Sequence, residues 1–146
     1  MPRNPWLIAG GMLSAAAALL HVAIIAGGPD WYRFFGAGEG MARMAERGML
    51  RPALITVGIA ALLAVWAAYA FAGAGLFRRL PLMRTALVAI TAIYLLRGLL
   101  LAPLLLIRPE IVDAFTLWSS LIVLVYGLAY GIGTWRAWPA LSAKAR

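Results

Sequence analysis

Residues 85–107 read TALVAITAIYLLRGLLLAPLLLI, an apolar run that contains a single charged residue, Arg97. As an α-helix, a run of this length crosses the roughly 30 Å hydrocarbon core of a bilayer. Arg97 lies about ten residues, or about 15 Å, from either end of the run. A charge at that depth costs about 2.5–3.5 kcal/mol to insert, so it requires a compensating partner. The stretch therefore predicts a transmembrane helix with a functional charge near its centre.

Three further apolar runs occupy about residues 6–27, 52–76 and 111–135. Of the 146 residues, 64% are hydrophobic and 12% are charged, which is too little polar surface to cover a soluble globule. The first run is longer than the core of a signal peptide, which favours an uncleaved helix. We therefore predict an all-α, integral membrane four-helix bundle that forms one transmembrane domain over residues 1–146.

Proline positions and small residues refine this prediction. Pro103 removes the hydrogen-bond donor for the Leu99 carbonyl, so a bend is expected near the far end of the third helix. The spacing Gly127-x-x-x-Gly131 permits close helix approach in the fourth helix. Packing within the chain and packing between two copies of the chain both remain open.

Residues 28–51 form the one long connection between the predicted helices. Its aromatic side chains suit a membrane–water interface, and they are Trp31, Tyr32, Phe34 and Phe35. Met41, Met44 and Ala45 share one face of a short helix. We expect this connection to form a lid or an interfacial helix.

The distribution of charge predicts the orientation. The N-terminus, the middle connection and the C-terminal tail carry basic residues without acids, namely Arg3, Arg78, Arg79, Arg84, Arg136, Lys144 and Arg146. In the other two connections Arg33, Arg43, Arg47, Arg51 and Arg108 are mixed with Asp30, Glu39, Glu46, Glu110 and Asp113. Because Lys and Arg accumulate on the cytoplasmic side, both termini are expected in the cytoplasm. The protein is expected in a bacterial inner (plasma) membrane.

Composition excludes several kinds of site. The chain has no cysteine, so thiol chemistry, iron–sulfur clusters and cysteine-based zinc sites are excluded. Its single histidine, His21, rules out haem ligation by two histidines of one chain. The net charge of +8 lies at helix ends and not on a basic stripe, which argues against nucleic acid. No metal or cofactor is assigned.

The candidate ligand-binding residues form a predicted polar seam under the long connection: His21, Arg97, Tyr94, Trp118, Ser119, Glu39 and Glu46. His21 lies about 22 Å along the first helix from Trp6, a depth close to that of Arg97. Glu39 and Glu46 are the candidate acidic partners of Arg97. The packing alternatives remain open, because a lone histidine is often a packing residue and surface acids often pair with arginines on their own helix.

Three functions fit this pattern. The first is a protein with an outward-opening pocket that binds or helps move an amphiphile with an acidic head, such as a lipid or a quinone. The second is a membrane enzyme with His21 as acid or base and Arg97 as stabiliser, in which Ser119 is a nucleophile only if His21 reaches it. The third is a structural subunit or assembly factor. The expected partners are the bilayer and a lipid-like ligand, with a homo-oligomer or larger membrane complex left open.

Overall fold

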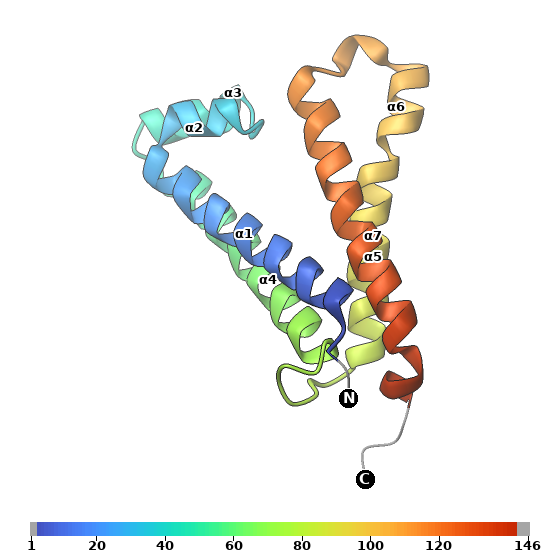
Figure 1. Ribbon diagram of the computed structural model, residues 1–146. Coiled ribbons are helices and arrows are strands. Elements are labelled where there is room, and N and C mark those ends of the chain that lie inside the picture. The colour runs from blue at the N-terminus through green and yellow to red at the C-terminus, as the bar shows by residue number, and fades with distance from the viewer. Residues whose placement is uncertain (1–2, 143–146) are drawn as a thin grey trace. The chain divides into compact units, whose positions relative to one another are not determined.

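The computed structural model describes residues 3–142, and within this range the chain is helical without strands (Figure 1). Four helices are long and apolar enough to cross a membrane: α1 (Pro5–Gly27), α4 (Arg51–Gly73), the segment Met83–Ile107, and α7 (Ala114–Ser142). This confirms the prediction of an all-α chain with four spans. Two basic residues used to predict the orientation, Lys144 and Arg146, lie outside the described residues.

The third span is interrupted where Pro103 predicts a bend. Helix α5 (Met83–Leu99) ends one residue before Leu100, and α6 (Leu101–Ile107) continues the segment (Figure 1). Proline has no N–H to donate to the Leu99 carbonyl, so the helical hydrogen-bond ladder is broken at this point.

The fourth span begins later and ends later than expected. Residues Pro109–Ile111 form a 3₁₀ turn, η1, and the Asp113 side chain accepts a 2.7 Å hydrogen bond from the Thr116 N–H. This cap moves the start of α7 from the expected Ile111 to Ala114. At the other end, α7 continues past the expected Trp135 to Ser142.

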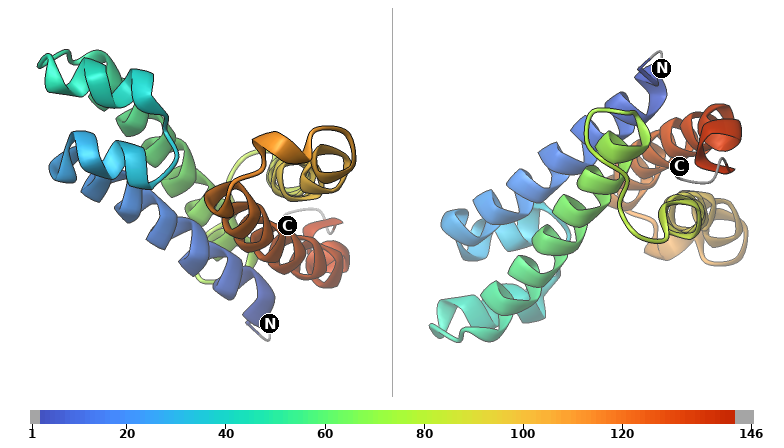
Figure 2. Two further views of the ribbon diagram at one scale, coloured as in Figure 1. Left: turned by 90° about the horizontal axis from the view of Figure 1, so that it is seen from above. Right: turned by 90° about the horizontal axis from the view of Figure 1, so that it is seen from below.

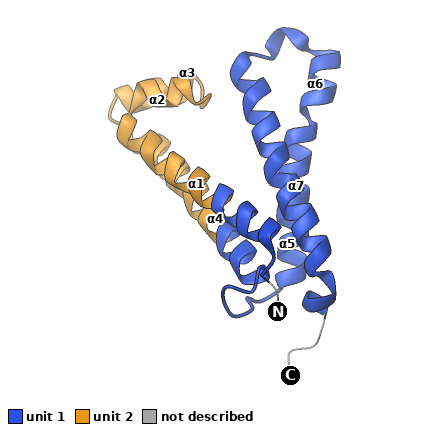
Figure 3. Cartoon of the chain, viewed as in Figure 1, with its two compact units in different colours: residues 1–13, 66–146 blue, residues 14–65 orange. Residues whose placement is uncertain are grey.

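The chain divides into two compact units, one of residues 14–65 and one of residues 1–13 with 66–146 (Figure 3). In residues 14–65, the connection between α1 and α4 folds into α2 (Pro29–Phe34) and α3 (Glu39–Glu46). Ile24, Tyr32 and Ala42 form a buried core against which Phe35, Met41 and Ala45 pack. We call α2 and α3 together the cap. Of the three residues predicted to share one face of a short helix, Met41, Met44 and Ala45, two pack against this core, namely Met41 and Ala45, and Tyr32 is part of the core.

In the other unit, α5 and α7 lie side by side (Figure 1 and Figure 2). Two glycines permit this contact. A Cβ atom on Gly98 would lie 2.9 Å from the Leu124 Cα, and one on Gly127 would lie 2.9 Å from the Leu95 nitrogen. Of the two roles open to Gly127, packing within the chain is therefore the one observed.

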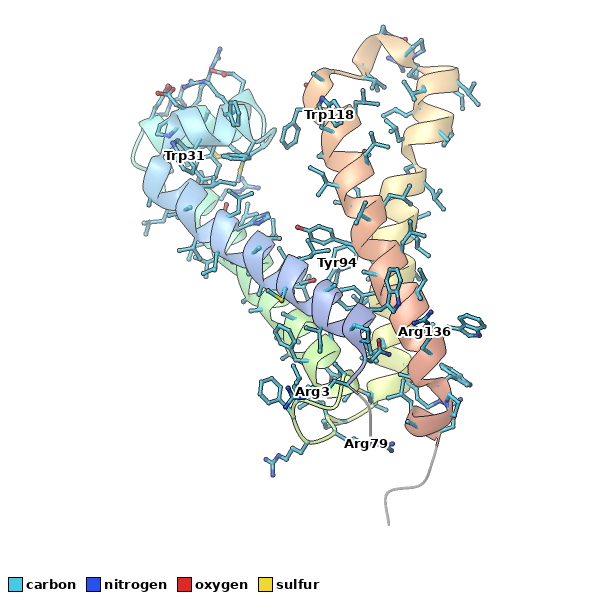
Figure 4. All side chains as sticks on the ribbon, viewed as in Figure 1. Arg3, Trp31, Arg79, Tyr94, Trp118 and Arg136 are labelled. Atoms are coloured by element: carbon cyan, nitrogen blue, oxygen red, sulfur yellow. The ribbon has the colours of Figure 1, made fainter. Side chains whose placement is uncertain are left out.

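One end of this unit joins three segments through Asn4. The Asn4 side chain donates a 2.7 Å hydrogen bond to the Gly133 carbonyl of α7, and its backbone N–H contacts the Ala74 carbonyl after α4. Asn4 Oδ1 also accepts from the N–H groups of Trp6 and Leu7, which caps α1. We call this the basic end, since Arg3, Arg79 and Arg136 gather there (Figure 4).

Candidate functional site

Arg97 lies on α5, three residues before the break at Leu100. Its Nη1 donates a 2.8 Å hydrogen bond to Oγ of Ser120 on α7. Ser120 is 1% exposed, whereas Arg97 is an exposed residue of the chain. Within residues 3–142, no carboxylate lies within 4.0 Å of the Arg97 guanidinium. Among the described residues, the Arg97 guanidinium therefore has a neutral hydroxyl as its hydrogen-bond partner and no counter-ion.

Arg97 lines a groove of about 490 Å³ between the third span and the start of α7. We call it the Arg97 groove, and its residues are Arg97, Leu100, Leu101, Pro103, Leu104, Ile107, Arg108, Thr116 and Ser120. Most of the wall is aliphatic. The break at Leu100 lets α6 diverge from α7 (Figure 1). The groove residues come from both of these segments.

The polar groups of the Arg97 groove are spread along its length. Arg97 and Ser120 lie at the level of the helix break. Arg108, at the end of α6, is already paired with Glu110 of the neighbouring turn. A ligand in the groove would therefore find an uncompensated guanidinium at the Arg97 level and aliphatic walls between Arg97 and Arg108. This combination suits a molecule with an anionic group and a hydrocarbon body.

Glu39 and Glu46, the predicted partners of Arg97, contact Arg33 in the described structure. Arg33 Nε lies 2.8 Å from Glu39 Oε2, and Arg33 Nη2 lies 2.6 Å from Glu46 Oε1. Hydrogen bonds from Arg33 and Arg43 lower the pKa of Glu39 to about 2. The hydrogen bonds of Arg33 to Glu39 and Glu46 raise the pKa of Arg33 above its ordinary value. The ions of the cap thus neutralise one another.

His21 belongs to the unit of residues 14–65, and Arg97 belongs to the other unit. The His21 Nδ1 lies 2.7 Å from the carbonyl oxygen of Ala17, one turn earlier in α1. A carbonyl only accepts, so Nδ1 carries the proton of this bond and Nε2 remains for another contact. A pocket shared by His21 and Arg97 stays a prediction.

Three other predicted site residues have local roles. Tyr94 is buried among aromatic rings, with ring centroids 4.9 Å from Trp66 and 5.4 Å from both Tyr126 and Tyr130. Trp118 is 63% exposed (Figure 4), and Ser119 Oγ donates to the carbonyl of Thr116 at 3.3 Å. None of the three lines the Arg97 groove.

The polar groove residues that the predicted seam omits are Ser120, Thr116 and Arg108. A signal for Ser120 was present in the sequence. Ser120 precedes Gly127 by seven residues, which is close to two helical turns, so the two share one face of α7. Because Gly127 marks the face that packs on α5, extending this stripe by seven residues would have selected Ser120 and not Ser119.

The contact between Arg97 and Ser120 does not activate the serine as a nucleophile. Ser120 Oγ accepts a hydrogen bond from a guanidinium, which is a cation and cannot take up the hydroxyl proton as a base would. Among residues 3–142 there is also no group of three or more His, Cys, Asp or Glu side chains placed to hold a metal ion.

No protein-family model, no curated protein and no solved structure shows significant similarity to the chain.

Proposed function

We propose that this protein binds an amphiphile with an acidic head group, such as a lipid or a quinone-like molecule, in the Arg97 groove. One observation carries the proposal: a guanidinium within a membrane span lines an aliphatic groove, hydrogen-bonded to a neutral serine and without a carboxylate among the described residues. A charge in hydrocarbon is stabilised by pairing, and a ligand anion would supply the missing partner.

The dimensions and chemistry of the groove support this choice. Its volume of about 490 Å³ falls within the range of roughly 300–1,000 Å³ typical of small-molecule sites. Arginine presents two parallel N–H groups that match the two oxygens of a carboxylate or phosphate. Leucine and isoleucine side chains would cover the hydrocarbon body of the ligand.

The orientation is part of the proposal. We infer that the basic end faces the cytoplasm of a plasma membrane, because its arginines have no neighbouring acids in sequence. On α5 and α6, the Arg97 groove lies toward Arg108, away from the start of α5 at Met83. The groove would then open toward the outer leaflet.

A second candidate function uses the same observation. The exposed guanidinium would equally be paired by a carboxylate of another membrane protein, which would make this chain a structural subunit or assembly factor. The two functions differ in what leaves the protein when Arg97 is replaced: a small amphiphile or a partner chain.

Native mass spectrometry of the full chain in mild detergent tests the proposal. Wild-type protein should carry a bound anionic amphiphile. Arg97→Lys keeps the charge but loses two-point recognition, so ligand occupancy should fall about tenfold. Arg47→Lys is the matched control, because Arg47 is the C-cap residue of α3 and lies outside the groove, and it should retain wild-type occupancy.

The variant Arg97→Leu distinguishes ligand binding from the structural function. Loss of the amphiphile supports the proposal. A folded Arg97→Leu protein that keeps the wild-type lipid complement would overturn it. Loss of a co-purified protein chain, without any change in bound lipid, would replace ligand binding by the structural function.

A further inference from the structure

A second groove of about 450 Å³ lies between α5 and α7, toward the basic end. Its wall includes Val88 and Leu95 of α5 and Trp135 and Trp138 of α7. We call it the tryptophan groove. It is separate from the Arg97 groove: Leu95 and Arg97 are two positions apart on α5, which places them about 200° apart around the helix.

Thr134 is one of two threonines that line this largely apolar groove. It is 5% exposed, and its Oγ1 has no hydrogen-bond partner among the described residues. Thr91 lines the same groove, but its hydroxyl donates to the Leu87 carbonyl of its own helix at 2.7 Å. A buried hydroxyl without a partner is unfavourable, so Thr134 indicates an acceptor that the described chain does not supply.

Arg84 places a positive charge beside the tryptophan groove. Its Cζ lies 4.4 Å from the ring centroid of Trp138, which itself lines the groove. No carboxylate among residues 3–142 lies within 4.0 Å of Arg84. Arg84 is exposed and precedes Val88 by one helical turn. The Arg84 guanidinium therefore lies at the end of the groove, where the head group of a lipid would lie if its acyl chain occupied the groove.

We propose that the tryptophan groove binds one anionic phospholipid. The lipid phosphate pairs with Arg84, an ester carbonyl accepts the hydrogen bond of Thr134, and an acyl chain lies along Val88, Leu95 and Trp135. The assignment rests on the order of these groups by depth along the groove. Thr134 lies four residues, or about 6 Å, deeper along α7 than Trp138, and in a phospholipid the ester groups lie deeper than the phosphate. This site does not depend on the proposed ligand of the Arg97 groove.

The test uses the full chain in mild detergent, with phosphatidylglycerol or phosphatidylcholine added and each bound lipid counted by native mass spectrometry. Wild-type protein should prefer the anionic lipid. Arg84→Gln should reduce that preference about fivefold, the factor expected for one basic residue at an anionic surface. Arg47→Gln removes a charge outside both grooves and should leave that preference unchanged. The measurement is repeated in the Arg97→Lys background, where the effect of Arg84→Gln should persist, and this keeps the two sites distinguishable.

The two threonines provide matched variants of equal size. Thr134→Val should weaken phosphatidylglycerol binding, whereas Thr91→Val should not, because the Thr91 hydroxyl is already bonded to its own helix. Thermal unfolding without added lipid checks that both variants fold. An undiminished anionic preference in Arg84→Gln, or equal binding by the two valine variants, would overturn the assignment.

Discussion

Arg33 and Arg97 carry the same side chain in opposite electrostatic surroundings. Arg33 contacts the carboxylates of Asp30, Glu39 and Glu46 at distances of 2.6–3.2 Å. Arg97 contacts the hydroxyl of Ser120 and no carboxylate among residues 3–142. The first guanidinium joins the two short helices of the cap, and the second keeps its charge available to a molecule that enters the groove.

Position relative to the membrane explains why this difference matters. The cap lies outside the four spans, so its ion pairs compete with water and salt, and each such pair adds little stability. Arg97 lies inside a span, where an unpaired charge is costly and a counter-ion is correspondingly favourable. Arg97 is therefore the guanidinium that a ligand anion would stabilise most.

The largest expected effect comes from giving Arg97 a carboxylate of its own. Ser120→Asp places an acid at the position of the present 2.8 Å contact and makes Arg97 resemble Arg33. Anionic ligand should then bind at least about tenfold more weakly, because it competes with an internal ion pair. Native mass spectrometry measures this loss. Ser119→Asp is the control, since Ser119 lies outside the groove, and an unchanged ligand affinity in Ser120→Asp would remove Arg97 from the site.

A second prediction compares removal of the two guanidiniums. Arg33→Leu leaves Asp30, Glu39 and Glu46 close together without their shared cation, so the cap should open and amide hydrogen exchange in residues 29–46 should rise several-fold. Arg97→Leu strands no carboxylate, so exchange in α5 should stay near its wild-type value. Hydrogen exchange with mass-spectrometric detection reports both regions in one experiment. A larger increase of exchange in α5 after Arg97→Leu than in the cap after Arg33→Leu would contradict this prediction.

The cap should also respond to acid. The pKa of Glu39 falls from its ordinary value of 4.5 to about 2 in the folded cap, through hydrogen bonds from Arg33 and Arg43. The folded state thus binds this proton less readily than the unfolded state, so the contribution of Glu39 is complete above about pH 4.5 and is lost as the pH falls toward about 2. Exchange in residues 29–46 should increase over this window. Glu39→Gln should flatten this pH dependence of exchange. If the variant kept the wild-type pH profile, the response to acid would come from another group.

The smallest expected effect is that of Arg33→Lys. Lysine keeps the positive charge, but it cannot reproduce the three-nitrogen contact of Arg33 with Asp30, Glu39 and Glu46. Exchange in the cap should therefore change by less than about twofold, well below the effect of Arg33→Leu. Arg43→Lys, which affects a single contact with Glu39, serves as the reference. Equal effects of Arg33→Lys and Arg33→Leu would show that geometry, and not charge, holds the cap together.

Features of the fold that depend on short stretches of chain are predictable from the sequence. Apolar run length predicts the spans, and the missing N–H of Pro103 predicts the interruption at Leu100. The fourth span was less accurately bounded, because its start depends on the side chain of Asp113 bonding to Thr116, a contact that hydropathy does not report.

The candidate site was predictable only in part. Arg97 stands out in any reading of the third span, since charges in hydrocarbon are rare. Its predicted partners were Glu39 and Glu46, whereas the described contact is with Ser120, the neighbour of the predicted seam residue Ser119. One position corresponds to a rotation of about 100°, which decides whether a hydroxyl faces the groove or bonds to its own helix.

The sequence by itself determined that the chain has four long apolar helices, that one of them is broken near Pro103, and that a guanidinium lies within a span. Hydropathy, proline geometry and helical rise are local properties, so no distant contact was needed. Only the tertiary structure decided which acids meet which arginines. Glu39 and Glu46 turn to Arg33 because the fold of α2 and α3 brings the three side chains within hydrogen-bond distance. Ion pairing depends on separation in space, and helix rotation and the folding of a connection set that separation.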